Sequence, residues 1–153
     1  MSQGTAKTRQ VFEWMHESSV AESAPSIARR VLMIDDDPVM RKLIIEMLSH
    51  RYQVMVSSNG LDLPRLMTEF VPDLVLLDVM MPWVNGLQIC RTIKSHSIWK
   101  TVPIIFISGR KKPADVELGL KQGADAYLTK PFSMVELLHQ IQTLLNEPAD
   151  ELF

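Results

Sequence analysis

The chain has 153 residues, of which 46% are hydrophobic and 22% charged, and its formal net charge is −2. These values are typical of one globular domain with its own core, and the charge gives no electrostatic reason to expect binding to nucleic acid or to an anionic membrane. The single cysteine excludes an internal disulfide and a cysteine-based metal cluster. The N-terminus lacks the apolar core of a signal peptide and no apolar run is long enough to span a membrane, so a cytoplasmic protein is expected.

Residues 1–29 differ in composition from the rest of the chain, being rich in Ser, Ala, Glu and Gln. Their one short apolar patch, VFEWMH, is too short to form a stable helix alone. We therefore expect an N-terminal extension that is either mobile or a short helix docking on the domain or on a partner. The domain itself is expected at residues 30–147, followed by a C-terminal tail at 148–153.

From Arg30 onward, five short apolar segments alternate with helical patterns. The segments LVLLD and IIFIS are almost continuously apolar, which is typical of strands buried on both faces of a sheet. The predicted strands are Val31–Ile34, Gln53–Ser57, Asp73–Leu77, Pro103–Ile107 and Ala126–Leu128.

The segments between the strands carry the apolar spacing of amphipathic helices. The first helix has such a face at Met40, Leu43, Ile44, Met47 and Leu48, and the last at Met134, Leu137, Leu138, Ile141 and Leu145. The helix boundaries are predicted by Gly86 before the middle helix, by Pro64 and Pro113 in first turns, and by the capping-box pair Ser133 and Glu136.

Five repeats of strand then helix predict an α/β fold, in which helices cover both faces of a parallel sheet. In open sheets of this kind, functional sites form beyond the carboxyl ends of the strands. The chemically distinctive residues of the chain all lie at these ends, and they are Asp35, Asp36, Asp37, Asp78, Ser108 and Lys130.

Carboxylates brought this close together interact unfavourably. Two like charges about 5 Å apart repel by roughly 3 kcal/mol at an effective dielectric near 20, so either one takes up a proton or a cation lies between them. Mg²⁺ suits this position because it takes few carboxylates and keeps places for water and phosphate oxygens. An aspartate beside Mg²⁺ can attack a phosphoryl group, with a lysine and a hydroxyl stabilising the oxygens. Each residue alone also fits a turn or a solvated surface, but together they favour a site.

Residues 30–147 resemble the receiver domains of two-component response regulators in the segments MIDDDPVMR, LVLLDVMMPWVNG, IIFISG and GADAYLTKPF. The resemblance implies a flavodoxin-like five-stranded sheet in the order 2-1-3-4-5. It also implies that Asp78 accepts a phosphoryl group from a histidine kinase or a histidine phosphotransfer protein in a phosphorelay. The chain would then be a signalling domain that catalyses only its own phosphorylation and dephosphorylation.

The resemblance further implies roles for the neighbouring residues. Asp36 and Asp78 would bind Mg²⁺ directly, Asp35 mainly through water, and Met80 through its backbone carbonyl. Asp37 is not a ligand in this scheme and is expected to cap the first helix.

Three other residues would form the switch. Ser108 corresponds to the switch hydroxyl, Lys130 to the lysine of the family, and Tyr127 to an aromatic side chain that turns inward on phosphorylation. The peptide bond before Pro131 is expected to be cis. A downstream protein target is expected to bind the face formed by the fourth helix, the fifth strand and the fifth helix, and a homodimer, where one forms, would use the same face.

Two positions depart from the common pattern of the family. Met80 and Arg110 lie two places after Asp78 and Ser108, where side chains tune how quickly water removes the phosphoryl group. An apolar Met80 cannot orient an attacking water, so slow self-dephosphorylation is expected.

Two other functions fit parts of the sequence. The stretch DDDPV matches the D-x-D-x-[TV] motif of haloacid-dehalogenase-type phosphatases, which would make Asp35 a nucleophile but leaves Asp78 and TKPF unexplained. The second alternative function is a receiver-like binding module without phosphotransfer, although the complete acidic set with Ser108 and Lys130 argues against it. The cognate kinase, the target, the oligomeric state and the presence of an output domain stay open.

Overall fold

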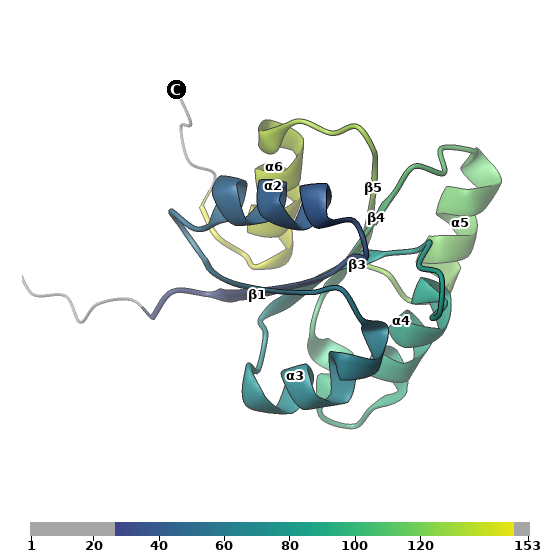
Figure 1. The fold of residues 1–153 in the computed structure, drawn as a ribbon, viewed down its shortest axis with the longest axis horizontal. Coiled ribbons are helices and arrows are strands. Elements are labelled where there is room, and N and C mark those ends of the chain that lie inside the picture. The colour runs from purple at the N-terminus through teal and green to yellow at the C-terminus, as the bar shows by residue number, and fades with distance from the viewer. Residues whose placement is uncertain (1–26, 149–153) are drawn as a thin grey trace, which may run out of the picture.

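The computed structural model describes residues 27–148, which form a five-stranded parallel sheet in the order β2-β1-β3-β4-β5 (Figure 1). The strands are β1 (Arg30–Ile34), β2 (Gln53–Ser57), β3 (Leu74–Asp78), β4 (Ile104–Ser108) and β5 (Ala126–Thr129). The predicted α/β fold and strand order are confirmed. The apolar patch predicted within residues 1–29 lies outside the described residues.

Within residues 27–148, four α-helices connect the strands and a fifth follows β5, and together they cover both faces of the sheet. They are α2 (Pro38–Leu48), α3 (Leu63–Glu69), α4 (Gly86–Ser95), α5 (Pro113–Lys121) and α6 (Met134–Leu144), with short 3₁₀ turns at Gly60–Asp62 and Trp99–Thr101. Helices α2 and α6 pack on one face, and α3, α4 and α5 lie on the other (Figure 1). Within residues 27–148, none of these helices is long and apolar enough to cross a membrane.

The helices begin where local side-chain chemistry predicts. The Asp37 carboxylate accepts a hydrogen bond from the backbone N–H of Val39 at 2.9 Å and so caps α2. Ser133 and Glu136 form the predicted capping box at the start of α6. Prolines occupy the first turns of α2, α3 and α5, where a missing N–H costs nothing.

The core consists of two apolar layers, one on each face of the sheet. Every residue of β3 and β4 is buried, as the continuous apolar runs predict. Two residues assigned to buried helix faces are exposed instead, with Leu43 at 37% and Met134 at 42%. Leu43 lies at the margin of the face that buries Ile44 and Leu48, and Met134 is the first residue of α6, one turn before its first buried residue.

Val71, between α3 and β3, has a backbone conformation that β-branched residues rarely adopt. Its φ of 53° lies in the left-handed region, and its side chain is 56% exposed, so the conformation gains little packing in return.

Val71→Asn should therefore stabilise the protein by about 1 kcal/mol, because asparagine tolerates this region. Urea unfolding measures the change. The control is Val39→Asn, at an exposed helical valine without positive φ, and an equal gain there would contradict the explanation.

Candidate functional site

Asp35 follows β1 directly and is fully buried. One carboxylate oxygen accepts the backbone N–H of Asp37 at 2.9 Å, and the other accepts a hydrogen bond from Nζ of Lys130 at 3.1 Å. Its backbone carbonyl accepts a hydrogen bond from the Arg41 guanidinium at 2.9 Å. Asp35 is therefore held from three sides, which fixes the turn that carries Asp36.

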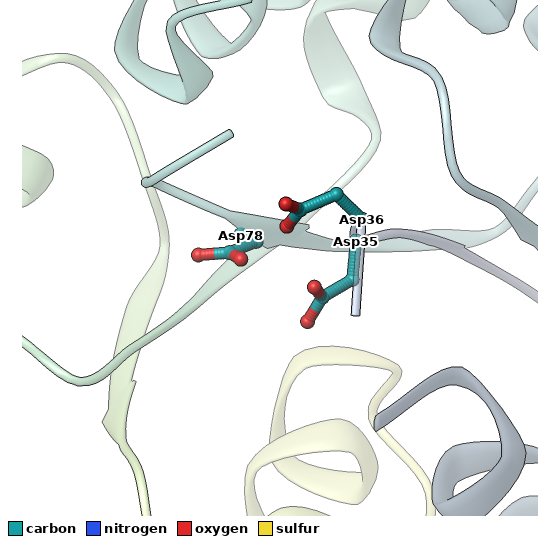
Figure 2. A group of neighbouring side chains, drawn as sticks. All are labelled: Asp35, Asp36 and Asp78. Atoms are coloured by element: carbon teal, nitrogen blue, oxygen red, sulfur yellow. The ribbon is translucent and has the colours of Figure 1, made fainter. Parts of the chain in front are cut away.

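Asp78 is the last residue of β3, and its side chain faces the same space. It is only 6% exposed, and Oδ1 accepts the backbone N–H of Met80 at 3.0 Å while Oδ2 lies 3.6 Å from Nζ of Lys130. Asp36 is exposed. One carboxylate oxygen from each of Asp35, Asp36 and Asp78 lies within 4.8 Å of the other two (Figure 2). The structure thus brings together the three aspartates predicted to form the metal site.

The charges in this cluster are strongly linked. Burial, and then the nearby charge of Asp35, raises the pKa of Asp78 to about 6, against the opposing effects of the Met80 amide and Lys130. Burial alone would lower the pKa of Lys130, but the charges of Asp35 and Asp78 outweigh it and raise that pKa. The cluster therefore favours a further positive charge near Asp78 and Asp36.

The residues present fit a hard divalent cation. Carboxylate oxygens are the ligands that Mg²⁺ prefers, and the exposed side of Asp36 leaves room for the waters that Mg²⁺ keeps. The loop after Asp78 is shaped by a bridge between Met80 and Asn85 and by the glycine at position 86. A Cβ on Gly86 would collide with the carbonyl oxygen of Asp78, so only glycine fits there.

Ser108 and Tyr127 lie on the strands next to this cluster. Ser108 is fully buried at the end of β4, and its hydroxyl accepts the backbone N–H of Arg110 at 3.1 Å. Tyr127 is half-buried, and its hydroxyl donates to the backbone carbonyl of Arg110 at 2.9 Å. Its ring meets Phe106 edge-on, with centroids 6.2 Å apart. The peptide bond between Lys130 and Pro131 is cis, as predicted.

Arg41 was not identified from the sequence as part of the site. The signal available was a basic residue one helical turn after the acidic cluster, but such a residue is usually a surface charge. Only the fold shows that its guanidinium turns back to the carbonyl of Asp35. Trp83 lines a cleft together with Asp36, Met80 and Arg110.

Comparison with known proteins agrees with this fold and cluster. The model of the response regulator receiver domain family matches residues 31–142. The chain is 35% identical over 127 residues to the DNA-binding response regulator MtrA of Mycolicibacterium smegmatis, covering 82% of this chain and 54% of MtrA. It is 42% identical over 119 residues to the transcriptional regulatory protein GltR of Pseudomonas aeruginosa, covering 77% of this chain and 49% of GltR. The chain thus spans about half the length of these relatives.

Solved structures give the same result. The BeF₃-activated N-terminal receiver domain of Klebsiella pneumoniae RstA superposes with a TM-score of 0.71 at 28% identity, covering 78% of this chain and 100% of that one. The chemotaxis protein CheY4 of Vibrio cholerae gives a TM-score of 0.72 at 25% identity, covering 77% and 99%.

The sheet order and the family match define a receiver domain, which is a signalling domain. The chain belongs to the response regulators of two-component signal transduction. The phosphatase alternative is not favoured, and Asp35, its required nucleophile, is fully buried and paired with Lys130.

Ionisation of Asp78 should destabilise the fold in the absence of a divalent metal. Because its folded pKa of about 6 lies above the unfolded value of about 4, the folded chain binds more protons between these pH values, and stability falls as the pH rises through them. Asp78→Asn removes this effect. The free energy of unfolding of the variant should therefore exceed that of wild type by up to about 3 kcal/mol above pH 6, and by progressively less toward pH 4.

Urea unfolding in EDTA across this pH range measures the difference. The control is Glu46→Gln, which neutralises an exposed carboxylate on α2 and should change stability by less than about 0.5 kcal/mol throughout. A gain for Asp78→Asn that does not vary with pH would contradict the electrostatic explanation.

Proposed function

We propose that Asp78 is the phosphoacceptor of this receiver domain and that Mg²⁺ assists the transfer. The observation that supports this most is the gathering of three aspartate oxygens within 4.8 Å beside the Lys130 ammonium. Asp36, Asp78 and the Met80 carbonyl would hold the ion directly, and Asp35 through water. The donor would be a histidine kinase or a histidine phosphotransfer protein.

In this reaction a carboxylate oxygen of Asp78 attacks phosphorus, and the P–N bond of the phosphohistidine breaks. The leaving imidazole nitrogen keeps the bonding electron pair, and the product is an aspartyl phosphate. When bound, Mg²⁺ supplies positive charge to the phosphoryl oxygens. Lys130 already lies 3.6 Å from Asp78 Oδ2 and would stabilise the same oxygens, while Ser108 would donate a hydrogen bond to one of them.

The output would be a change of the face formed by α5, β5 and α6. Drawing Ser108 toward the phosphoryl group would disturb its hydrogen bond with the Arg110 amide, and the Arg110 carbonyl also holds the hydroxyl of Tyr127. Tyr127 would then turn inward, so that a downstream protein, or a second copy of the chain, binds the altered face.

We also propose the wider organisation of the chain. Residues 30–147 form the receiver domain, flanked by an extension at 1–29 and a tail at 148–153, and the protein works in the cytoplasm. The names of MtrA and GltR support control of transcription as the output of a longer protein of this kind. The expectation that this chain does not itself bind nucleic acid stays a prediction.

Asp78→Asn should abolish phosphorylation while the fold is retained. Full-length wild type, Asp78→Asn and Asp62→Asn are incubated with phosphoramidate and Mg²⁺, and the phosphoryl group is located by mass spectrometry under mild conditions. Asp62 lies outside the acidic cluster, so its variant should be labelled like wild type. Undiminished labelling of the Asp78→Asn variant would remove the proposed function.

The aspartyl phosphate should be long-lived, because the apolar side chain of Met80, 52% exposed, cannot orient an attacking water. Met80→Asn should shorten its lifetime several-fold by providing a hydrogen-bonding group at this position. Loss of label from Asp78 after removal of the donor, in excess Mg²⁺, measures the rate. Leu87→Asn, at a residue lining the same cleft, serves as the control. A wild-type half-life of seconds would refute this expectation.

A further inference from the structure

Trp83 is unusual among the residues of this domain because it is a large aromatic side chain left in water. It is 92% exposed, the highest fraction among the exposed large hydrophobic residues within 27–148. Trp99 behaves differently, since it stacks on His96 at a centroid distance of 3.7 Å and packs against the core. Trp83 belongs to neither core layer, so burial within residues 27–148 does not explain it.

Trp83 lies within a group of apolar residues on the loop between β3 and α4 and on the first turn of α4. Met80 is 52% exposed, Pro82 is exposed, and Val84 and Leu87 are half-buried. All of these residues line one cleft, and together we call them the Trp83 lip: Met80, Pro82, Trp83, Val84 and Leu87. A contiguous apolar patch around an exposed tryptophan is typical of a protein interface, where tryptophan often contributes most of the binding energy.

The Trp83 lip adjoins the acidic cluster. Asp36, which contributes an oxygen to the cluster, lines the same cleft, and the backbone N–H of Met80 donates to the Asp78 carboxylate. Asp78 is only 6% exposed, so a donor must come close over this end of the sheet to reach it. A protein large enough to carry a phosphohistidine would cover the lip as it does so.

We propose that the Trp83 lip binds the protein phosphodonor, with Trp83 packing against an apolar side chain that the donor presents beside its phosphohistidine. This inference rests on the proposed function of Asp78. It assigns different tasks to the two sides of the cleft, since the carboxylates and Lys130 carry out the transfer and Trp83 contributes affinity for the partner. A small phosphodonor occupies only the polar side and makes no use of Trp83.

Phosphorylation by two kinds of donor tests the proposal. Full-length wild type, Trp83→Ala, Trp83→Phe and Ile98→Ala are phosphorylated either by phosphoramidate or by a panel of purified histidine kinases and histidine phosphotransfer domains loaded with phosphate. Ile98 is a matched control, because it is apolar and 76% exposed but does not line the cleft. Rates are measured over a range of donor concentrations.

With phosphoramidate, all four proteins should be labelled at the same rate. With the protein donor that phosphorylates wild type best, Trp83→Ala should reduce kcat/KM at least tenfold, mostly by raising KM. Trp83→Phe should restore much of the loss, and Ile98→Ala should have no effect.

Several results would overturn the proposal. Equal rates for wild type and Trp83→Ala with the protein donor would do so, as would an equal loss with both kinds of donor, which would place Trp83 in the transfer chemistry. Labelling of wild type by phosphoramidate but by no phosphohistidine protein would make a protein donor the wrong occupant. A dimer of wild type that Trp83→Ala dissociates, seen by sedimentation at the assay concentration, would assign the lip to a second copy. Failure of phosphoramidate to label wild type would instead remove the proposed function, and this inference with it.

Discussion

The Lys130 ammonium between two buried carboxylates is the interaction on which the rest of this site depends. It lies 3.1 Å from Asp35 and 3.6 Å from Asp78, and neither carboxylate can turn to water because both are buried. Burial and then the nearby charge of Asp35 raise the pKa of Asp78, and the Met80 amide and the Lys130 ammonium only partly offset them, so the pKa is raised even with a lysine beside the carboxylate. The cluster therefore has an unsatisfied preference for positive charge, which a divalent cation would meet. Without a cation, ionisation of Asp78 lowers the free energy of unfolding of the domain, so the residue that would bind the cation is also one that destabilises the fold.

The sheet topology explains why these groups meet although they are far apart in the sequence. In the order 2-1-3-4-5, β1 and β3 are neighbours, and the helices that come after them cover opposite faces of the sheet. The chain therefore diverges above and below the sheet after Asp35 and after Asp78, which leaves a crevice at this edge. Lys130 reaches the crevice from the end of β5. The order of strands, rather than any local motif, brings the carboxylates and the ammonium together.

The features predicted correctly from the sequence are those set by local chemistry. Strands β3 and β4 are recognisable because a strand buried on both faces must be apolar throughout, and the capping role of Asp37 follows from its position before Pro38. Asp35, Asp36 and Asp78 are expected to lie together because they end neighbouring parallel strands, and they do. Their roles toward Mg²⁺ and phosphate stay predictions. The features missed depend on neighbours distant in sequence: the Arg41 bond to the Asp35 carbonyl, the exposure of Leu43 at the margin of α2, and the positive φ of Val71.

The exposure of Trp83 shows how chemistry and recognition can be separated within one loop. Asp78 and the Met80 amide are constrained by the sheet edge and by the close contact at Gly86, so this part of the loop can change little without moving the acidic cluster. Pro82 and Trp83, four and five residues after Asp78, are both exposed. A substitution there is expected to alter the surface of the cleft beside the site, which these residues line together with Asp36. A tryptophan at such a position, at the expense of exposing an indole to water, is best explained by a partner that covers it.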